Sequence, residues 1–269
     1  MTESASILPR TAREILGIFK ALRLDDVARH FDTDEEDIDP YVVCDRVSVD
    51  AFNAYVGDGE GLRVALRFLD LTDDGRLLIL ELPTIVHEST VEEFKGEFLD
   101  ATGNRREVAK RGSMTASIAA LPKKEADATY GPMGSTPNQT APPAPRTIAD
   151  WVTLAVEVGR SQSWAALTRA VNWWCQYAGI QYILVMKVSA SGRQMRYALY
   201  DIAILGNLPM PTASGTFRRR ANNPPAVEVQ FDMHRILSIP AHQALPAGVN
   251  QVAVVDLRTV LDLVVRCLR

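Results

Sequence analysis

The chain has 269 residues, of which 47% are hydrophobic and 23% are charged, so it can bury a sizeable core in one large domain or in one domain with extensions. Its three cysteines are far apart and form no C-x-x-C pair, which argues against a disulfide framework or a cysteine zinc site. The net charge of −4 is uneven, because residues 1–100 carry 10 Lys/Arg and 23 Asp/Glu whereas residues 151–269 carry 12 and 6. The basic part could meet a polyanion that the acidic part would repel, or both are differently solvated surfaces.

The sequence also predicts where the protein resides. It has no apolar run of about 18 residues, the length that a membrane helix needs. Its first residues lack a basic stretch followed by a long apolar one, so a secretory signal is not expected. We therefore predict an intracellular protein, cytoplasmic or nuclear, with no membrane as partner.

Residues 1–59 are predicted to form an acidic, helical N-terminal extension. Apolar residues recur at helical spacing up to residue 31, and an acidic connector (DTDEED, residues 32–37) follows them. We expect this extension to pack on the rest of the chain through three apolar side chains, those of Ile15, Phe19 and Leu22.

Residues 60–269 are predicted to form an α/β (α+β) core with a mixed sheet flanked by helices. The apolar patterns place strands at residues 62–68, 76–82, 107–121, 126–130, 151–158, 182–188, 196–204 and 227–236. Helices are expected at residues 84–100, 164–177 and 255–268, and loops at residues 131–147 (Pro/Gly-rich) and 206–226. The strand at 151–158 is almost wholly apolar, which is typical of a central strand buried on both faces.

Three carboxylates lie at the boundaries of these elements. Glu157 interrupts the apolar strand, Asp127 has a similar place on a shorter strand, and Glu88 lies near a helix start. A buried carboxylate is costly unless it is paired or binds a cation, and an acid near a helix N-terminus is favoured by the helix dipole alone. Structural roles are therefore open to each of them. Together they could hold Mg²⁺, which prefers oxygen ligands and can activate water for attack on a phosphodiester.

Four segments carry a resemblance to a known family. They are LELPTIVHE (80–88), KEADATYGP (124–132, with Ala126 where the motif has proline), VEVGRSQS (156–163) and the helix at 167–174. In this order they resemble the PD-(D/E)XK nuclease superfamily, in particular the Uma2-like proteins and uncharacterised fungal relatives. The resemblance covers about residues 60–205 and implies a restriction-endonuclease-like fold.

The resemblance also implies a site. Asp127 and Glu157 would bind Mg²⁺ (or Mn²⁺) together with the carbonyl of Val158, and Glu88 would bind the metal or a metal-bound water. The three carboxylates are then expected to converge within reach of one hydrated ion. The substrate would be nucleic acid, DNA or RNA.

One position departs from the family's motif. The motif's lysine stands two residues after the glutamate, and that position is Gly159 in this chain. Gln162, just past the strand, or Lys187, on the next strand, could orient the attacking water instead. A helix-start hydrogen bond for Gln162 and an exposed strand end for Lys187 are the structural alternatives.

Other side chains remain open to two interpretations. His87 could donate to a phosphate or to the neighbouring acids, or be a local capping or core residue. The basic runs Lys123–Lys124 and Arg218–Arg220 could contact phosphates or be surface loops. Trp173 and Trp174 are expected in the helix core rather than as a base-stacking platform.

Two functions follow from these observations. The first is a Mg²⁺-dependent nuclease, a hydrolase of phosphodiester bonds. The second is a catalytically silent binding or regulatory module that keeps the fold, which the missing lysine and the acidic first hundred residues favour. No phosphate-binding glycine loop, G-x-S-x-G motif or nicotinamide or flavin motif is present, and nothing in the sequence assigns an oligomeric state.

Overall fold

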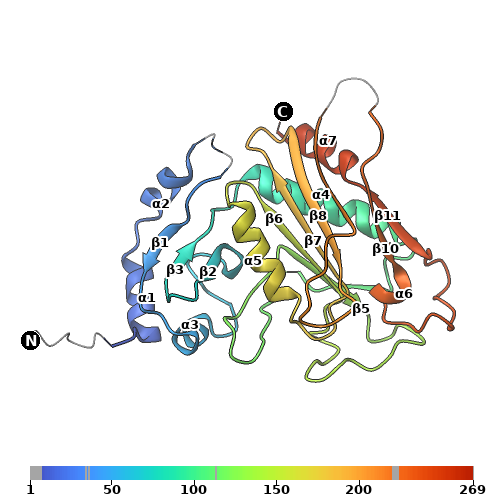
Figure 1. The fold of residues 1–269 in the computed structure, drawn as a ribbon, viewed down its shortest axis with the longest axis horizontal. Helices are drawn as coiled ribbons and strands as arrows, with labels where there is room; N and C mark the ends of the chain where they lie inside the picture. The colour runs from blue at the N-terminus through green and yellow to red at the C-terminus, as the bar shows by residue number, and fades with distance from the viewer. Residues whose placement is uncertain (1–7, 34, 36, 113, 220–223, 269) are drawn as a thin grey trace, which may run out of the picture. The chain divides into compact units, whose positions relative to one another are not determined.

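The computed structural model describes residues 8–33, 35, 37–112, 114–219 and 224–268 (Figure 1). The chain divides into two compact units. Unit 1 comprises Met1–Thr33, Ile38–Leu82 and Thr115–Glu125, and unit 2 comprises Asp34–Asp37, Pro83–Met114 and Ala126–Arg269. No helix in the described parts of the chain is long and apolar enough to cross a membrane.

Unit 1 combines short helices with a small antiparallel sheet. Its helical segments are α1 (Ala12–Ala21), α2 (Leu24–Phe31), α3 (Val49–Val56) and the 3-10 turn η1 (Leu66–Phe68). Its strands, in spatial order, are β1 (Tyr41–Cys44), β3 (Leu77–Ile79) and β2 (Leu69–Leu71). The apolar sides of all these elements meet in one core, which includes Ile15, Phe19, Phe52, Leu66 and Leu77.

The boundary that we predicted between residues 59 and 60 does not coincide with these units. Because β1 pairs with β3, and β3 with β2, the hairpin after residue 68 belongs with the N-terminal helices. Ile15 and Phe19 are buried in the core of unit 1, and Leu22 is partly buried against it.

The strand predicted at 62–68 is wrong, because Phe68 donates its backbone N–H to the carbonyl of Ala65 and closes a 3-10 turn instead.

Unit 2 contains a six-stranded mixed sheet. Its spatial order is β4 (Val108–Lys110), β5 (Ala128–Pro132), β6 (Leu154–Gly159), β7 (Tyr182–Val188), β8 (Gln194–Asp201) and β9 (Ala213–Arg218). Strands β6 and β7 are parallel and the other pairs are antiparallel. All residues of β6 are buried and the strand is interior, so the predicted central position of the Glu157 strand is confirmed.

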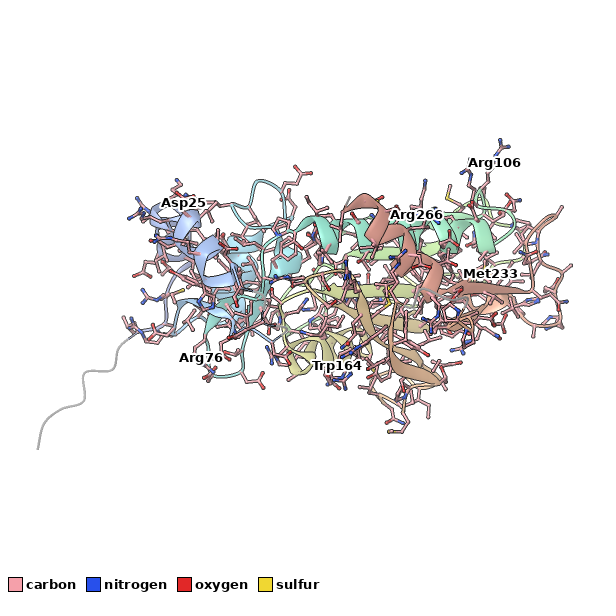
Figure 2. The ribbon with its side chains drawn as sticks, turned by 90° about the horizontal axis from the view of Figure 1, so that it is seen from above. Asp25, Arg76, Arg106, Trp164, Met233 and Arg266 are labelled. Atoms are coloured by element: carbon pink, nitrogen blue, oxygen red, sulfur yellow. The ribbon has the colours of Figure 1, made fainter. Side chains whose placement is uncertain are left out.

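Helices flank this sheet on both faces. One face packs against α4 (Ile85–Ala101), α7 (Leu257–Cys267) and the hairpin of β10 (Glu228–Asp232) and β11 (Val252–Asp256), while the short α6 (Met233–Ile236) follows β10. Helix α5 (Trp164–Trp174) packs on β6 and β7, and Trp164 at its first turn is labelled in Figure 2. Val156 and Val158 point into the α4 side, so Glu157 between them points to the α5 side. The predicted α/β class with a mixed sheet flanked by helices is confirmed.

Some elements of unit 2 differ from the predictions. The predicted strand region 107–121 contains only the three-residue β4, and β9 lies inside the predicted loop 206–226. Strand β9 has the sequence ASGTFR, whose small and polar residues give no apolar alternation, and it is held by pairing along β8. Arg220, of the predicted basic run, lies outside the described residues.

Candidate active site

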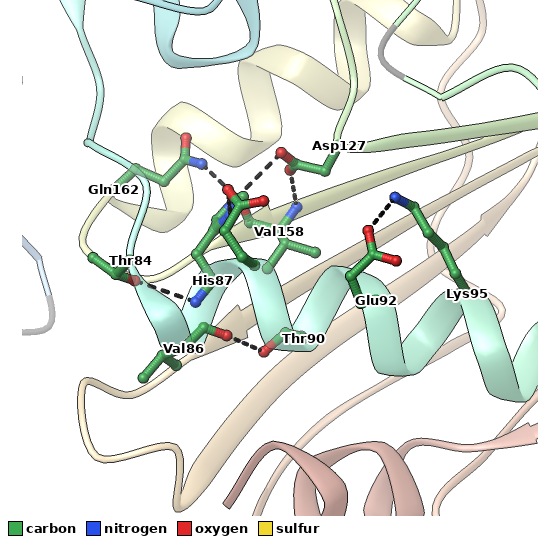
Figure 3. A network of polar contacts seen from close by, with 10 residues as sticks. Thr84, Val86, His87, Thr90, Glu92, Lys95, Asp127, Val158 and Gln162 are labelled. Carbon is green, nitrogen blue, oxygen red and sulfur yellow. Dashed lines mark hydrogen bonds and ion pairs between the residues drawn. The ribbon is translucent and has the colours of Figure 1, made fainter. Parts of the chain in front are cut away.

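Four segments of unit 2 meet at one end of the sheet. They are the first turn of α4, the residue before β5, the last residues of β6 and the turn that leads into α5. Figure 3 shows the side chains that they bring together, with His87, Gln162 and Asp127 all reaching Val158. We call His87, Asp127, Val158 and Gln162 the Asp127 network.

His87 is fixed by the start of α4. Thr84 is the N-cap of this helix, and its hydroxyl accepts the backbone N–H of His87 at 3.2 Å. The imidazole is 1% exposed, and its Nε2 lies 3.2 Å from both Asp127 Oδ1 and the carbonyl oxygen of Val158. Both oxygens are acceptors, so a proton on Nε2 would be donated to them. His87 Nδ1 lies 3.2 Å from Glu88 Oε1, so this side chain links two of the predicted acids.

Asp127 is held by two kinds of donor. Its carboxylate is 4% exposed, and Oδ2 accepts the backbone N–H of Val158 at 2.7 Å while Oδ1 faces His87. Hydrogen bonds to a buried carboxylate offset the cost of removing it from water. The sequence placed Asp127 beside the β6 strand, and the structure joins it directly to the residue after Glu157.

Glu157 has a different partner. It is also 4% exposed, and its Oε1 accepts the indole N–H of Trp174 at 2.6 Å. Trp174 is in the helix core as predicted, but its role in holding Glu157 was not predicted. A signal for it exists in the sequence, because a buried indole N–H usually finds an acceptor and Glu157 is the acid on the neighbouring strand.

Gln162 occupies the space beside Gly159. Its Nε2 donates to the carbonyl oxygen of Val158 at 3.1 Å. A Cβ atom on residue 159 would lie 3.1 Å from Leu167 Cδ1 and 2.7 Å from Gln162 Cγ. The contact with Gln162 Cγ is shorter than two carbon atoms allow. The absence of a side chain at the motif's lysine position therefore lets the Gln162 side chain approach the strand.

Lys187 lies next to this position on β7. The parallel register pairs Gly159 with Lys187, and the lysine is buried rather than at an exposed strand end. Its Nζ donates to the backbone carbonyl of Gln162 at 2.5 Å and forms an ion pair with Asp37 at 3.0 Å. The chain thus places a buried cation beside the position where the motif has its lysine.

The donor set for a metal is chemically suitable but engaged in protein contacts. Asp127, Glu157 and the Val158 carbonyl offer hard oxygen atoms, the type that Mg²⁺ prefers. Each of these three groups already accepts a hydrogen bond from the protein, as described above. The fourth predicted ligand, Glu88, is 42% exposed at the edge of the network. Within the described residues no group of three or more His, Cys, Asp or Glu side chains is arranged to hold a metal ion. The metal ligands therefore stay a prediction.

Gly159→Ala is expected to destabilise the protein by about 1–2 kcal/mol, because the new methyl group forces the Gln162 side chain away from β6. Urea unfolding measures this cost. Gly96→Ala in α4 is the matched control, since nothing lies within 4 Å of its added methyl and alanine favours a helix. Adding Gln162→Ala to Gly159→Ala should restore part of the loss. A Gly159→Ala protein as stable as the original would contradict the packing described here.

Comparisons with known proteins include a similarity to a solved structure. No protein-family model matches the chain, and no curated protein matches it. The chain is similar to the crystal structure of a protein from Anabaena variabilis described as a "putative nuclease belonging to DUF820". The TM-score is 0.48 at 10% identity, and the alignment covers 81% of this chain and 99% of the other.

Proposed function

We propose that this chain is a metal-dependent hydrolase of nucleic-acid phosphodiester bonds. The observation that carries the proposal is the Asp127 network, in which a buried carboxylate, a backbone carbonyl, an imidazole and an amide converge at the ends of β5 and β6. Lys187, a buried cation, touches this network through the Gln162 carbonyl. Buried polar groups of this kind are expensive for a fold to keep, which favours a functional role.

Each side chain then has a task. Asp127, Glu157 and the Val158 carbonyl would hold Mg²⁺ or Mn²⁺, with Glu88 binding the ion or its water. When bound, the ion would lower the pKa of a water molecule and stabilise charge on the phosphate. His87 orients Asp127 by facing its Oδ1. The Gln162 amide or the Lys187 ammonium orients the attacking water, in place of the motif's lysine.

A catalytically silent nucleic-acid-binding module is the second candidate. Two observations favour it. The Lys187 ammonium is paired with Asp37, and the Val158 carbonyl already accepts a hydrogen bond from Gln162. Such a protein would keep the fold and bind nucleic acid without turnover.

Cleavage assays separate the two candidates. Single- and double-stranded DNA and RNA oligonucleotides are incubated with the protein in Mg²⁺ or Mn²⁺, with EDTA as the blank. We expect metal-dependent products that disappear in Asp127→Asn, which keeps the side-chain shape but removes the charge. Asp100→Asn, an exposed acid on α4, is the matched control and should cleave normally. A folded protein that cleaves none of the substrates with either metal would contradict the hydrolase and favour the binding module.

A further inference from the structure

A polar pocket lies beside the Asp127 network. It has a volume of about 230 Å³ and lies on strands β7, β8 and β9 next to the start of α5. Its lining includes Lys187, Arg196, Thr216, Gln194, Trp164 and Asp37. Gln162 connects it to the Asp127 network, because its amide donates to Val158 while its backbone carbonyl accepts from Lys187.

The strand register puts two cations side by side in this pocket. Lys187 on β7 is directly opposite Arg196 on β8, and Arg196 is directly opposite Thr216 on β9. Directly opposed residues point to the same face of a sheet. Like charges in this arrangement repel each other, so an anion between them would be strongly favoured.

Arg196 is held in place while its hydrogen-bond donors stay available. Its guanidinium lies 3.9 Å from the centre of the Trp164 ring, an arrangement that fixes a flat guanidinium by cation–π attraction. Within the described part of the chain, the Arg196 side chain makes no hydrogen bond or ion pair. A planar fork with free donors matches the oxygens of a phosphate.

In the structure, the anion next to Lys187 is the carboxylate of Asp37. Its carboxylate lies 3.0 Å from Lys187 Nζ, yet its side chain is 67% exposed, and it belongs to the acidic sequence DTDEED. An anion that replaced it would keep the buried Lys187 ammonium paired, so the exchange would leave no buried charge uncompensated. The carboxylate can therefore be exchanged for another anion at small cost.

We propose that this pocket binds a backbone phosphate of a nucleic-acid strand, next to the phosphate at the Asp127 network, and that Asp37 occupies the pocket until the strand displaces it. The inference rests on the proposed function for the choice of a nucleic acid as ligand. It adds a binding position on β7 and β8, beside the candidate metal ligands on β6. It also makes the Asp37 carboxylate a competitor of the substrate phosphate.

The test measures binding without cleavage. A fluorescent single-stranded oligonucleotide is titrated with the full chain in EDTA, and anisotropy gives the affinity at several salt concentrations. Arg196→Met and Lys187→Met should each weaken binding about tenfold and reduce the slope of log K against log salt by about 0.7, the value for one phosphate contact on a single strand. Asp37→Asn should strengthen binding several-fold. Thermal unfolding of each variant shows that it is folded.

Matched variants exclude a general charge effect. Lys95→Met removes a cation from α4, where it pairs with Glu92, and Asp39→Asn removes an exposed acid two residues from Asp37. Equal changes in these controls and in the pocket variants would overturn the proposal. So would binding of inorganic phosphate with the same variant dependence but no oligonucleotide binding, because the pocket would then take a free anion.

The outcome is separable from that of the cleavage assay. Oligonucleotide binding with this variant pattern, but without cleavage in any metal, would refute the hydrolase and support the phosphate pocket. Cleavage lost in Asp127→Asn, with binding in EDTA indifferent to Arg196 and Asp37, would refute the pocket alone.

Discussion

Asp127→Ala is expected to lower the free energy of unfolding by about 3 kcal/mol. The substitution leaves the buried N–H of Val158 without its acceptor and removes the carboxylate that faces the buried His87. An unsatisfied buried donor costs about 1–3 kcal/mol, and a hydrogen bond to a charged group contributes about 1.5–3 kcal/mol. Urea unfolding followed by circular dichroism measures the change.

Two further variants serve as controls for the Asp127 prediction. Asp127→Asn keeps an oxygen acceptor for the Val158 N–H, so it should lower the free energy of unfolding clearly less than Asp127→Ala does. Asp100→Ala removes an exposed acid from α4 and should change stability by less than about 0.5 kcal/mol. If Asp127→Ala and Asp100→Ala unfold at the same urea concentration, the carboxylate does not hold the strand end as described.

Trp174→Phe is expected to lower the free energy of unfolding by about 2 kcal/mol, the second largest effect that we predict after Asp127→Ala. The change keeps an aromatic ring in the core of α5 but removes the only N–H of the indole, which donates to the buried Glu157 carboxylate. Hydrogen bonds to charged groups contribute about 1.5–3 kcal/mol. Equilibrium unfolding in urea again provides the measurement.

A double-mutant cycle isolates this bond. In a Glu157→Leu background the N–H has lost its charged acceptor, so Trp174→Phe should cost at least 1 kcal/mol less than in the original chain. Trp151→Phe is the matched control, because Trp151 is also buried and its Nε1 has no hydrogen-bond partner among the described residues. Additive costs in the cycle would mean that the Glu157–Trp174 bond does not contribute.

Much of the sheet could be predicted because its signals are local. The apolar runs of β6 and β7 indicate buried strands, and Thr84 and Ser163 are N-caps at the predicted helix starts. The fold class and the central place of β6 follow from such patterns. In unit 1 the pairing of β1 with β3 depends on contacts between distant residues, so the local pattern misplaced both the strand at 62–68 and the domain boundary.

The candidate site was predictable in composition but not in its contacts. The resemblance of the four motif segments placed Asp127, Val158, Gln162 and Lys187 in one site. Hydrogen bonds join Asp127 to Val158 and Lys187 to Gln162. His87 was left open between a local role and donation to acids, and the structure places it against Asp127 and Glu88. No local pattern could reveal the pairing of Lys187 with Asp37, because 150 residues separate them.

The interleaving of the two units has a consequence for the order in which the chain can fold during synthesis. The last stretch of unit 1 ends at Glu125, whereas unit 2 needs β11 and α7 near the C-terminus to complete its core. Chains emerge from the ribosome N-terminus first, and domains generally fold as units. Unit 1 can therefore close while the first helix of unit 2, α4, is already outside the ribosome and waiting for its sheet. During this interval the apolar side of α4, with Phe94 and Phe98, has no partner and is a point at which the nascent chain is exposed to aggregation or to chaperones.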